Sequence, residues 1–180
     1  MVEKERIQKA LDRFAKHVTT QAKRNLTQKD HNDTKKLYNS IKSEVKVMPN
    51  SIGLYFTMEE HGLYQDLGVK GKRSSAKAPE SPFKFGSGTG KEGGLTEAIE
   101  KWVTRKRFQF KSKEEGSKGR YLSYKQTAHL ITRSIYSKGL QPTLFFTRPF
   151  QAAFKNLPDE IVKEYGLEAT ELFKMSFKIK

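Results

Sequence analysis

Three stretches decide the fold that we expect of this chain: Asp33-Thr34-Lys35-Lys36-Leu37-Tyr38-Asn39-Ser40-Ile41, then Tyr64-Gln65-Asp66-Leu67-Gly68, then Phe145-Phe146-Thr147-Arg148-Pro149-Phe150. The chain is expected to change direction in each of them. The first is a polar cap that opens into a strand, the second an aromatic stretch that ends on a glycine, and the third a proline at the start of an apolar helix. None of these patterns supplies catalytic chemistry, so together they indicate an architecture.

The segments around these stretches predict helices and one hairpin. Apolar residues at steps of three and four predict an amphipathic helix over residues 3–27, with Ile7, Leu11, Phe14, Val18, Ala22 and Leu26 on one face. Alternation from Leu37 to Thr57 around the turn at 48–51 predicts a β-hairpin, in which Ile52, Leu54 and Phe56 share one face. Further helices are predicted over 95–106, over 123–137, from an N-cap at Thr147, and from 158 to about 175.

The expected fold class is therefore α+β: a small antiparallel sheet packed by the N-terminal and C-terminal helices, with a long helical and loop insertion. We expect a single domain over residues 1–180, with a basic insertion over 70–142. Residues 59–68 fit a short helix or a third strand equally well. Residues 69–94 are rich in Gly, Ser and Pro and fit either a disordered segment or a long functional loop. Trp102, on the helix over 95–106, is expected in the core.

Composition bounds the class of protein. Only 35% of the 180 residues are hydrophobic, which leaves a modest core, so part of the chain is expected to be solvated or stabilised by neighbours in an assembly. The sequence has no cysteine, which excludes disulfides and thiolate metal sites. No apolar run approaches the roughly 20 residues that span a bilayer. We expect a soluble protein without membrane contact, made in a cytoplasm or packaged into a particle built there.

Positive charge is concentrated in the middle of the chain. Residues 70–125 hold fifteen lysines and arginines against six glutamates, a net +9 of the total +15. Such an excess favours a polyanion, above all nucleic acid, although it also fits a solvated loop that keeps the protein soluble. The stretch from Arg105 to Lys113 interleaves cations with Phe108 and Phe110, which suits base stacking, contact with a duplex backbone, or the edge of an assembly contact. The candidate interface residues are Lys70, Lys72, Arg73, Arg105, Lys106, Arg107, Lys111, Lys113, Lys118 and Arg120.

Catalytic chemistry is sparse, and no enzyme activity, cofactor or metal is expected. The four histidines have no metal-ligand spacing. Glu59-Glu60-His61 with Asp66 is interpreted as a turn with charged flanks, because hydrolases need convergent groups from separate elements. The glycine-rich run from Gly86 to Lys91 fails the spacing of a phosphate-binding loop.

The order of the three stretches resembles the tail-completion, or head-to-tail joining, proteins of tailed bacteriophages. Those proteins show an N-terminal helix, an Asp-Thr-Gly-x-Leu-x-x-Ser-Ile motif before a strand, an aromatic-x-x-acid-aromatic-Gly stretch, and a proline-containing start of the final helix. Lys35 stands where that pattern has glycine, Leu67 where it has an aromatic residue, and Val69 where it has threonine. The matching residues are Asp33, Thr34, Leu37, Ser40, Ile41, Tyr64, Asp66, Gly68, Phe146, Pro149, Phe150 and Ala153.

The resemblance implies a virion structural protein that forms a homo-oligomeric ring in the phage neck or tail. Its partners would be other copies of itself, the portal or adaptor, the tail proteins and passing duplex DNA, and it would be assembled in the bacterial cytoplasm. The basic segment 70–125 would then lie at such an interface, mobile in the free monomer and fixed in the assembly. The alternative from charge alone is a stand-alone basic nucleic-acid-binding protein.

Overall fold

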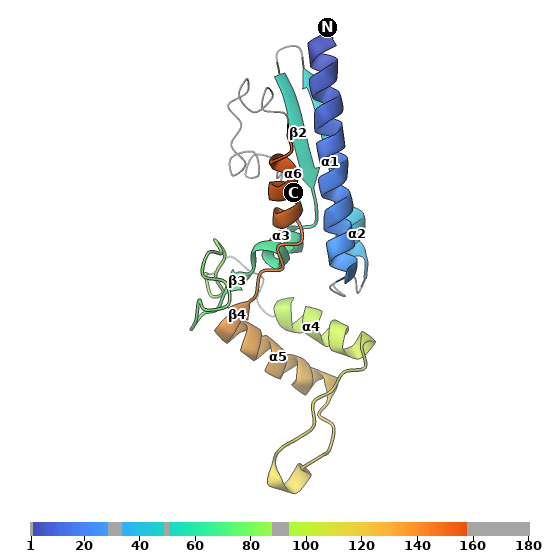
Figure 1. Ribbon diagram of the computed structural model, residues 1–180. Helices are drawn as coiled ribbons and strands as arrows, with labels where there is room; N and C mark the ends of the chain where they lie inside the picture. The colour runs from blue at the N-terminus through green and yellow to red at the C-terminus, as the bar shows by residue number, and fades with distance from the viewer. Residues whose placement is uncertain (1, 29–33, 49–50, 88–93, 158–180) are drawn as a thin grey trace. The chain divides into compact units, whose positions relative to one another are not determined.

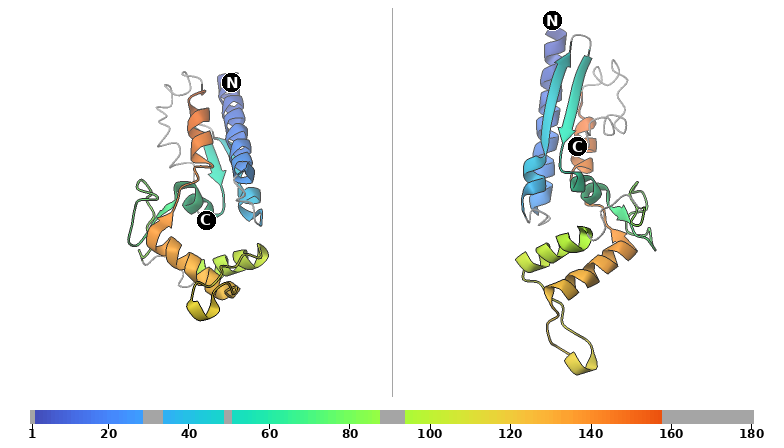
Figure 2. Two further views of the ribbon diagram at one scale, coloured as in Figure 1. Left: turned by 60° about the horizontal axis from the view of Figure 1, so that its bottom comes forward. Right: turned by 180° about the vertical axis from the view of Figure 1, so that it is seen from behind.

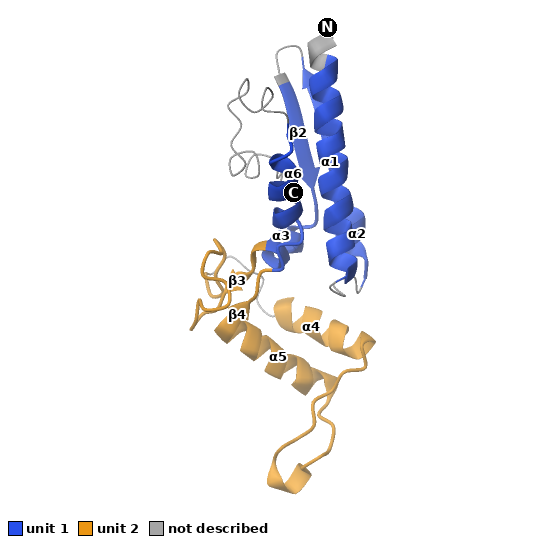
Figure 3. Ribbon diagram, viewed as in Figure 1, with its two compact units in different colours: residues 1–66, 143–180 blue, residues 67–142 orange. Residues whose placement is uncertain are grey.

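The computed structural model describes residues 2–28, 34–48, 51–87 and 94–157 (Figure 1). The chain divides into two compact units, which Figure 3 colours separately. Unit 1 comprises residues 1–66 and 143–180, and unit 2 comprises residues 67–142. The described elements combine helices with small antiparallel sheets, which confirms the α+β class. The predicted insertion over 70–142 falls within unit 2, whereas the predicted helix over 158–175 and Asp33 lie outside the described residues.

Unit 1 is built on a long helix and a hairpin. Helix α1 (Val2–Gln28) buries the apolar face that its spacing predicts: Ile7, Leu11, Phe14, Val18, Ala22 and Leu26. Strands β1 (Lys42–Met48) and β2 (Ser51–Thr57) pair antiparallel, with Val45 opposite Leu54. Figure 2 shows this hairpin running along α1. Leu54 and Phe56 are buried and Ile52 packs against the same core, so the predicted face of the second strand is confirmed.

Phenylalanine rings from three elements meet in the core of unit 1. Helix α6 (Thr147–Phe154) places Phe150 with its ring centroid 5.4 Å from that of Phe14 on α1 and 6.0 Å from that of Phe56 on β2. The rings of Phe56 and Phe146 are 5.1 Å apart. These three pairs meet edge to face, the arrangement that aromatic quadrupoles favour. The described N-terminal and C-terminal helices therefore pack the sheet, as the sequence predicts.

The stretch before β1 corrects the sequence prediction. Residues 36–40 form a short helix, α2 (Lys36–Ser40), where the alternation predicts a strand from Leu37. The helix buries Leu37 and is closed by the Ser40 hydroxyl, which donates to the Leu37 carbonyl at 2.8 Å. Lys35 precedes it with a φ of 55°, in the left-handed region that favours glycine. The strand prediction from Leu37 is wrong because a single buried leucine in so short a segment is compatible with a helix as well as with a strand.

The second stretch is helical. Residues 60–67 form α3 (Glu60–Leu67), which decides between the helix and the third strand that the sequence left open. The predicted turn at Glu59-Glu60-His61 is therefore wrong, since Glu60 and His61 open this helix. Gly68 follows it with a φ of 72°, so this stretch does end on a glycine that its backbone conformation requires.

Unit 2 begins and ends in a two-residue ladder. Strand β3 (Val69–Lys70) pairs antiparallel with β4 (Gly139–Leu140). The loop over 71–87 folds back on β3, and the buried Ser81 hydroxyl donates to the Gly68 carbonyl at 2.7 Å. The backbone is so close here that a Cβ at Gly71 would lie 2.3 Å from the Ser137 carbonyl oxygen. The described part of the glycine-rich segment is thus a packed loop with defined hydrogen bonds.

Two helices form the rest of unit 2. Helix α4 (Gly94–Arg105) packs against α5 (Tyr124–Lys138), close to the predicted bounds of both. Ser123 caps α5 in a capping box with Gln126, and Gly139 ends it with a φ of 88°. Val103 and Ala128 are fully buried between the helices, but Trp102 is only half-buried, so its predicted core position is wrong. Between the helices lies an arm, residues 106–123, with the 3-10 turn η1 (Glu115–Ser117) at its tip (Figure 1).

Candidate functional site

The second and third stretches meet at a single carboxylate in unit 1. Asp66, which is 1% exposed, accepts the Phe146 N–H at 2.8 Å and the Thr147 N–H at 3.3 Å. The Thr147 hydroxyl also donates to Asp66. Two further bonds hold the returning chain beside α3, because Thr143 and Leu144 donate their N–H groups to the carbonyls of Gln65 and Asp66. Asp66 therefore caps α6 from 80 residues away.

This capping arrangement corrects the predicted role of Thr147. Phe146 occupies the N-cap position and Thr147 is the first residue of α6, with no side-chain cap from the N-cap residue itself. The carboxylate of Asp66 replaces a local cap and is well placed against the positive end of the helix dipole. Pro149 lies in the first turn as the sequence predicts, where its missing N–H leaves no bond unmade.

The remaining described motif residues also build the scaffold. Leu37 and Ile41 are buried against the core, and the Ser40 hydroxyl accepts the Glu59 N–H at 3.0 Å. Tyr64 is an exception, because its side chain is 36% exposed and its hydroxyl donates to Glu60 at 2.9 Å. That hydrogen bond, followed by burial and the nearby Glu60 charge, raises the pKa of Tyr64. Thr34 is exposed.

The predicted basic residues fall into two groups at opposite ends of α5. Lys72 and Arg73 donate their N–H groups to the carbonyls of Tyr136 and Ser137, in the last turn of that helix. The Lys72 ammonium lies 5.9 Å from the centre of the Tyr136 ring. Lys70 is in β3, beside this group. The Lys72 charge thus lies near the C-terminal end of α5, where the helix dipole favours a cation.

The second group lies on and beside the arm. The arm has two limbs, an outgoing one before η1 and a returning one after it. They are held together by a β-bridge between Lys111 and Tyr121 and by a hydrogen bond from the Ser112 N–H to the Arg120 carbonyl at 2.8 Å. The hydroxyls of Ser112 and Ser117 lie 2.7 Å apart across the tip. The helix of fifteen residues between the two groups is about 22 Å long at 1.5 Å per residue. The structure therefore brings together Arg105, Lys106, Arg107, Lys111, Lys113, Lys118 and Arg120, but not Lys70, Lys72 and Arg73 with them.

A Schellman motif joins α4 to the arm. The Phe108 N–H donates to the Val103 carbonyl at 2.9 Å and the Arg107 N–H donates to the Thr104 carbonyl at 3.2 Å. Arg107 has a φ of 51° at the position that glycine usually occupies in this motif. The Phe108 ring then lies 6.3 Å from that of Trp102 and 5.1 Å from that of Phe110. The turn that ends α4 thus holds Arg107 in a backbone conformation that favours glycine, directly before a cluster of three aromatic rings.

The aromatic side chains of the arm face solvent. Phe108 is 41% exposed, Phe110 38% and Tyr121 66%, and the Lys111 ammonium lies 5.2 Å from the centre of the Tyr121 ring. The arm holds six lysines and arginines against Glu114 and Glu115. None of Lys111, Lys113, Lys118 and Arg120 forms an ion pair with a described carboxylate. Exposed cations alternating with exposed rings are what a nucleic-acid strand requires of a binding surface.

Tyr121 is part of this surface but is not among the residues predicted from the sequence. The predicted aromatic residues lie only between Arg105 and Lys113, and the prediction for the returning limb names only its cations, Lys118 and Arg120. The signal was present, since Gly116 and Gly119 mark a turn between two aromatic-basic segments of similar length. Interpreting these glycines as the turn of a hairpin would have placed Tyr121 opposite Lys111, as the structure does.

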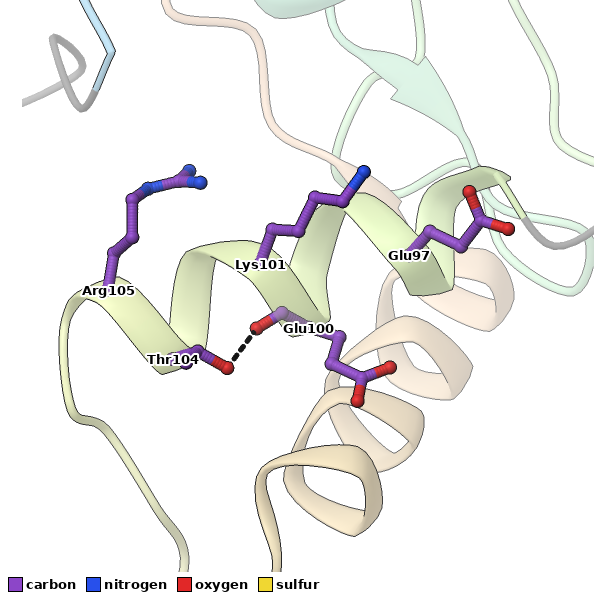
Figure 4. A pocket seen from close by; sticks show the side chains of 5 residues that line it. All are labelled: Glu97, Glu100, Lys101, Thr104 and Arg105. Carbon is purple, nitrogen blue, oxygen red and sulfur yellow. Dashed lines mark hydrogen bonds between the residues drawn. The ribbon is translucent and has the colours of Figure 1, made fainter.

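A shallow groove runs along α4. It is an open surface groove of about 470 Å³ lined by Glu97, Glu100, Lys101, Thr104 and Arg105. Figure 4 shows these side chains along one helix, with the Thr104 hydroxyl donating to the Glu100 carbonyl at 2.8 Å. In the described ranges no three His, Asp or Glu side chains are placed to hold a metal ion.

The described elements thus define an α+β protein whose second unit carries a basic, aromatic arm. Comparison of the chain with protein-family models, with curated proteins and with solved structures gave no match. Among the described helices, none is long and apolar enough to cross a membrane.

Proposed function

We propose that the protein is a virion structural protein of a tailed bacteriophage, forming a homo-oligomeric ring in the neck or tail. In that role it joins the head, through the portal or adaptor, to the tail during assembly and DNA passage. It acts in the virion after assembly in the bacterial cytoplasm, and it is not a catalyst. The proposal rests on the resemblance of three ordered stretches to tail-completion proteins.

The observation that carries the proposal is the convergence of those stretches on one scaffold. Leu37 and Ile41 from the first and Phe150 from the third are buried in the same core. Asp66 from the second accepts the N–H of Phe146 from the third. Motifs that specify an architecture are expected to meet in its core, as these residues do.

Exposed apolar side chains in unit 1 also support self-assembly. Val47 is 46% exposed and Met48 41% exposed, at the end of β1. Contact with a neighbouring subunit would remove this apolar surface from water and stabilise the ring.

A gene deletion in a phage that encodes the chain tests this proposal. Electron microscopy of the lysate is expected to show DNA-filled heads and detached tails, and expression of the chain in trans should restore joined particles. Native mass spectrometry of the purified chain at high concentration should show one closed oligomer of fixed subunit number. Joined, infectious particles that lack the chain would overturn the proposal.

The second candidate function is a stand-alone nucleic-acid-binding protein, which the exposed arm favours. Under this alternative the chain is absent from purified particles and remains monomeric while it binds DNA. Mass spectrometry of the particles therefore separates the two functions.

A further inference from the structure

We propose that the arm, residues 106–123, is a binding element for nucleic acid with unpaired bases. Its cations hold the phosphates, and the exposed rings of Tyr121 and Phe108 stack on the bases. This inference goes beyond the neck function, because it assigns a ligand to a surface of unit 2 whether or not unit 1 assembles into a ring.

Charge complementarity selects a polyanion as the occupant. Six cations lie on the arm against two glutamates. Lys111, Lys113, Lys118 and Arg120 are exposed and form no ion pair with a described carboxylate. A phosphate backbone neutralises such a row and gains affinity from the counterions that it releases.

The rings select unpaired bases over a closed duplex. Tyr121 is 66% exposed, and the Lys111 ammonium lies 5.2 Å from its ring centre. Phe108 is 41% exposed and is braced by Trp102 and Phe110. Rings in this position cannot reach bases inside a duplex without opening it, whereas a single strand presents base faces for stacking. An acidic protein surface would leave these aromatic faces without a matching contact.

Hydrogen bonds within the arm hold its two limbs together. Bonds between Ser112 and Arg120, between Leu122 and Phe110, and from the Gln109 side chain to the Leu122 carbonyl fix its two limbs. The Schellman motif fixes its root with Arg107 in the left-handed region. These internal bonds reduce the ordering that the arm must undergo when it binds a strand, compared with a loop that has none.

Fluorescence anisotropy with labelled DNA tests the proposal. The probes are a single strand of about 20 nucleotides, longer than one small binding site, and the duplex of the same sequence. The arm variant carries Lys111→Gln, Lys113→Gln, Lys118→Gln and Arg120→Gln. Its matched control carries Lys9→Gln, Arg13→Gln, Lys16→Gln and Arg24→Gln, which removes the same charge from exposed positions of α1. Circular dichroism confirms that each variant is folded.

The arm variant is expected to lose on the order of 100-fold in affinity for the single strand at 0.1 M salt, and its salt slope should fall by about 3, or about 0.7 per lost phosphate contact. The control variant should change affinity far less. Tyr121→Ala should weaken single-strand binding about 10-fold and leave duplex binding nearly unchanged, while Tyr121→Phe, which keeps the ring, should bind normally.

Three results would each overturn the proposal: equal losses in the arm and control variants, a duplex bound as tightly as the single strand without any effect of Tyr121→Ala, or no DNA binding at all. Binding of the arm to an acidic protein, without any binding to DNA, would also overturn the proposal. None of these results bears on ring formation, which the particle experiments measure independently.

Discussion

The two units use aromatic residues in opposite ways. In unit 1, Phe14, Phe56, Phe146 and Phe150 are buried and meet in one core. In unit 2, Phe108, Phe110, Tyr121 and Tyr136 are between 38% and 66% exposed. The same residue types therefore stabilise one unit and form the surface of the other. This difference explains how a chain with little hydrophobic content keeps a stable scaffold and still displays a basic, aromatic arm.

The sharpest test of this difference applies one substitution to both units. Phe56→Ala should lower the free energy of unfolding by about 3–5 kcal/mol, because it opens a cavity in the core of unit 1. Phe110→Ala, the matched control in unit 2, should lower it by less than about 1 kcal/mol, because its ring is 38% exposed. Urea unfolding followed by circular dichroism measures both values. Equal losses of unfolding free energy in the two variants would contradict the proposed difference between buried and exposed aromatic residues.

The capping carboxylate gives the next largest effect. Asp66→Ala should cost about 2–4 kcal/mol, because it leaves the N–H groups of Phe146 and Thr147 without their acceptor. Asp66→Asn keeps one acceptor oxygen and should lose about half as much. Thermal unfolding of the two variants measures the difference, and a neutral Asp66→Ala would show that α6 needs no cap.

Backbone contacts, in place of a large apolar core, hold the base of unit 2. Gly71→Ala should cost about 1–3 kcal/mol, because the new Cβ would meet the carbonyl oxygen of Ser137 and the amide nitrogen of Gly139 at 2.3 and 2.6 Å. Gly116→Ala is the control, since nothing lies within 4 Å of its Cβ position. The fluorescence of Trp102, the only tryptophan and a residue of unit 2, follows unfolding of both variants. A neutral Gly71→Ala would contradict the close packing.

Lys35 in unit 1 and Arg107 in unit 2 both have a positive φ, so glycine variants at the two positions distinguish backbone strain from a role in DNA binding. Lys35→Gly in unit 1 and Arg107→Gly in unit 2 should each raise stability by about 0.5–1 kcal/mol, because glycine adopts the left-handed region freely. Lys36→Gly, at the first residue of α2, should instead lower it, because glycine gains nothing at a helical φ. Only Arg107→Gly should also weaken binding of single-stranded DNA, by about fivefold for one phosphate contact. Equal DNA binding by the Lys35 and Arg107 variants would remove the functional reason for the strain.

The smallest effect concerns the exposed tyrosine of unit 1. The pKa of Tyr64 is raised because its hydroxyl donates to Glu60. A raised pKa in the folded state contributes stability below the ordinary value of 10.0, and this contribution is lost as pH rises through the folded pKa. Glu60→Ala should therefore shift the ultraviolet titration of one tyrosine to lower pH. Because the ring is 36% exposed, thermal stability at neutral pH should hardly change.

Local patterns in the sequence were enough to predict most elements. The spacing from Ile7 to Leu26 predicts α1, the alternation from Ile52 to Phe56 predicts β2, and Ser123 with Gly139 brackets α5. These succeed because each element is encoded by its own residues. The bond between Asp66 and Thr147 joins positions 81 apart, and no local rule contains it. The helix at Leu37 was missed because so short a segment takes its structure from tertiary contacts. The pairing of Lys111 with Tyr121 is local, and it was missed because the glycines between them were not interpreted as a hairpin turn.

Amide hydrogen exchange of the intact chain, with and without single-stranded DNA, tests the division between scaffold and contact surface most directly. DNA is expected to slow exchange in the arm, residues 106–123, and to leave α1, β1 and β2 unchanged. Protection that is spread over α1 and the hairpin of unit 1, or that leaves the arm unaffected, would contradict the account.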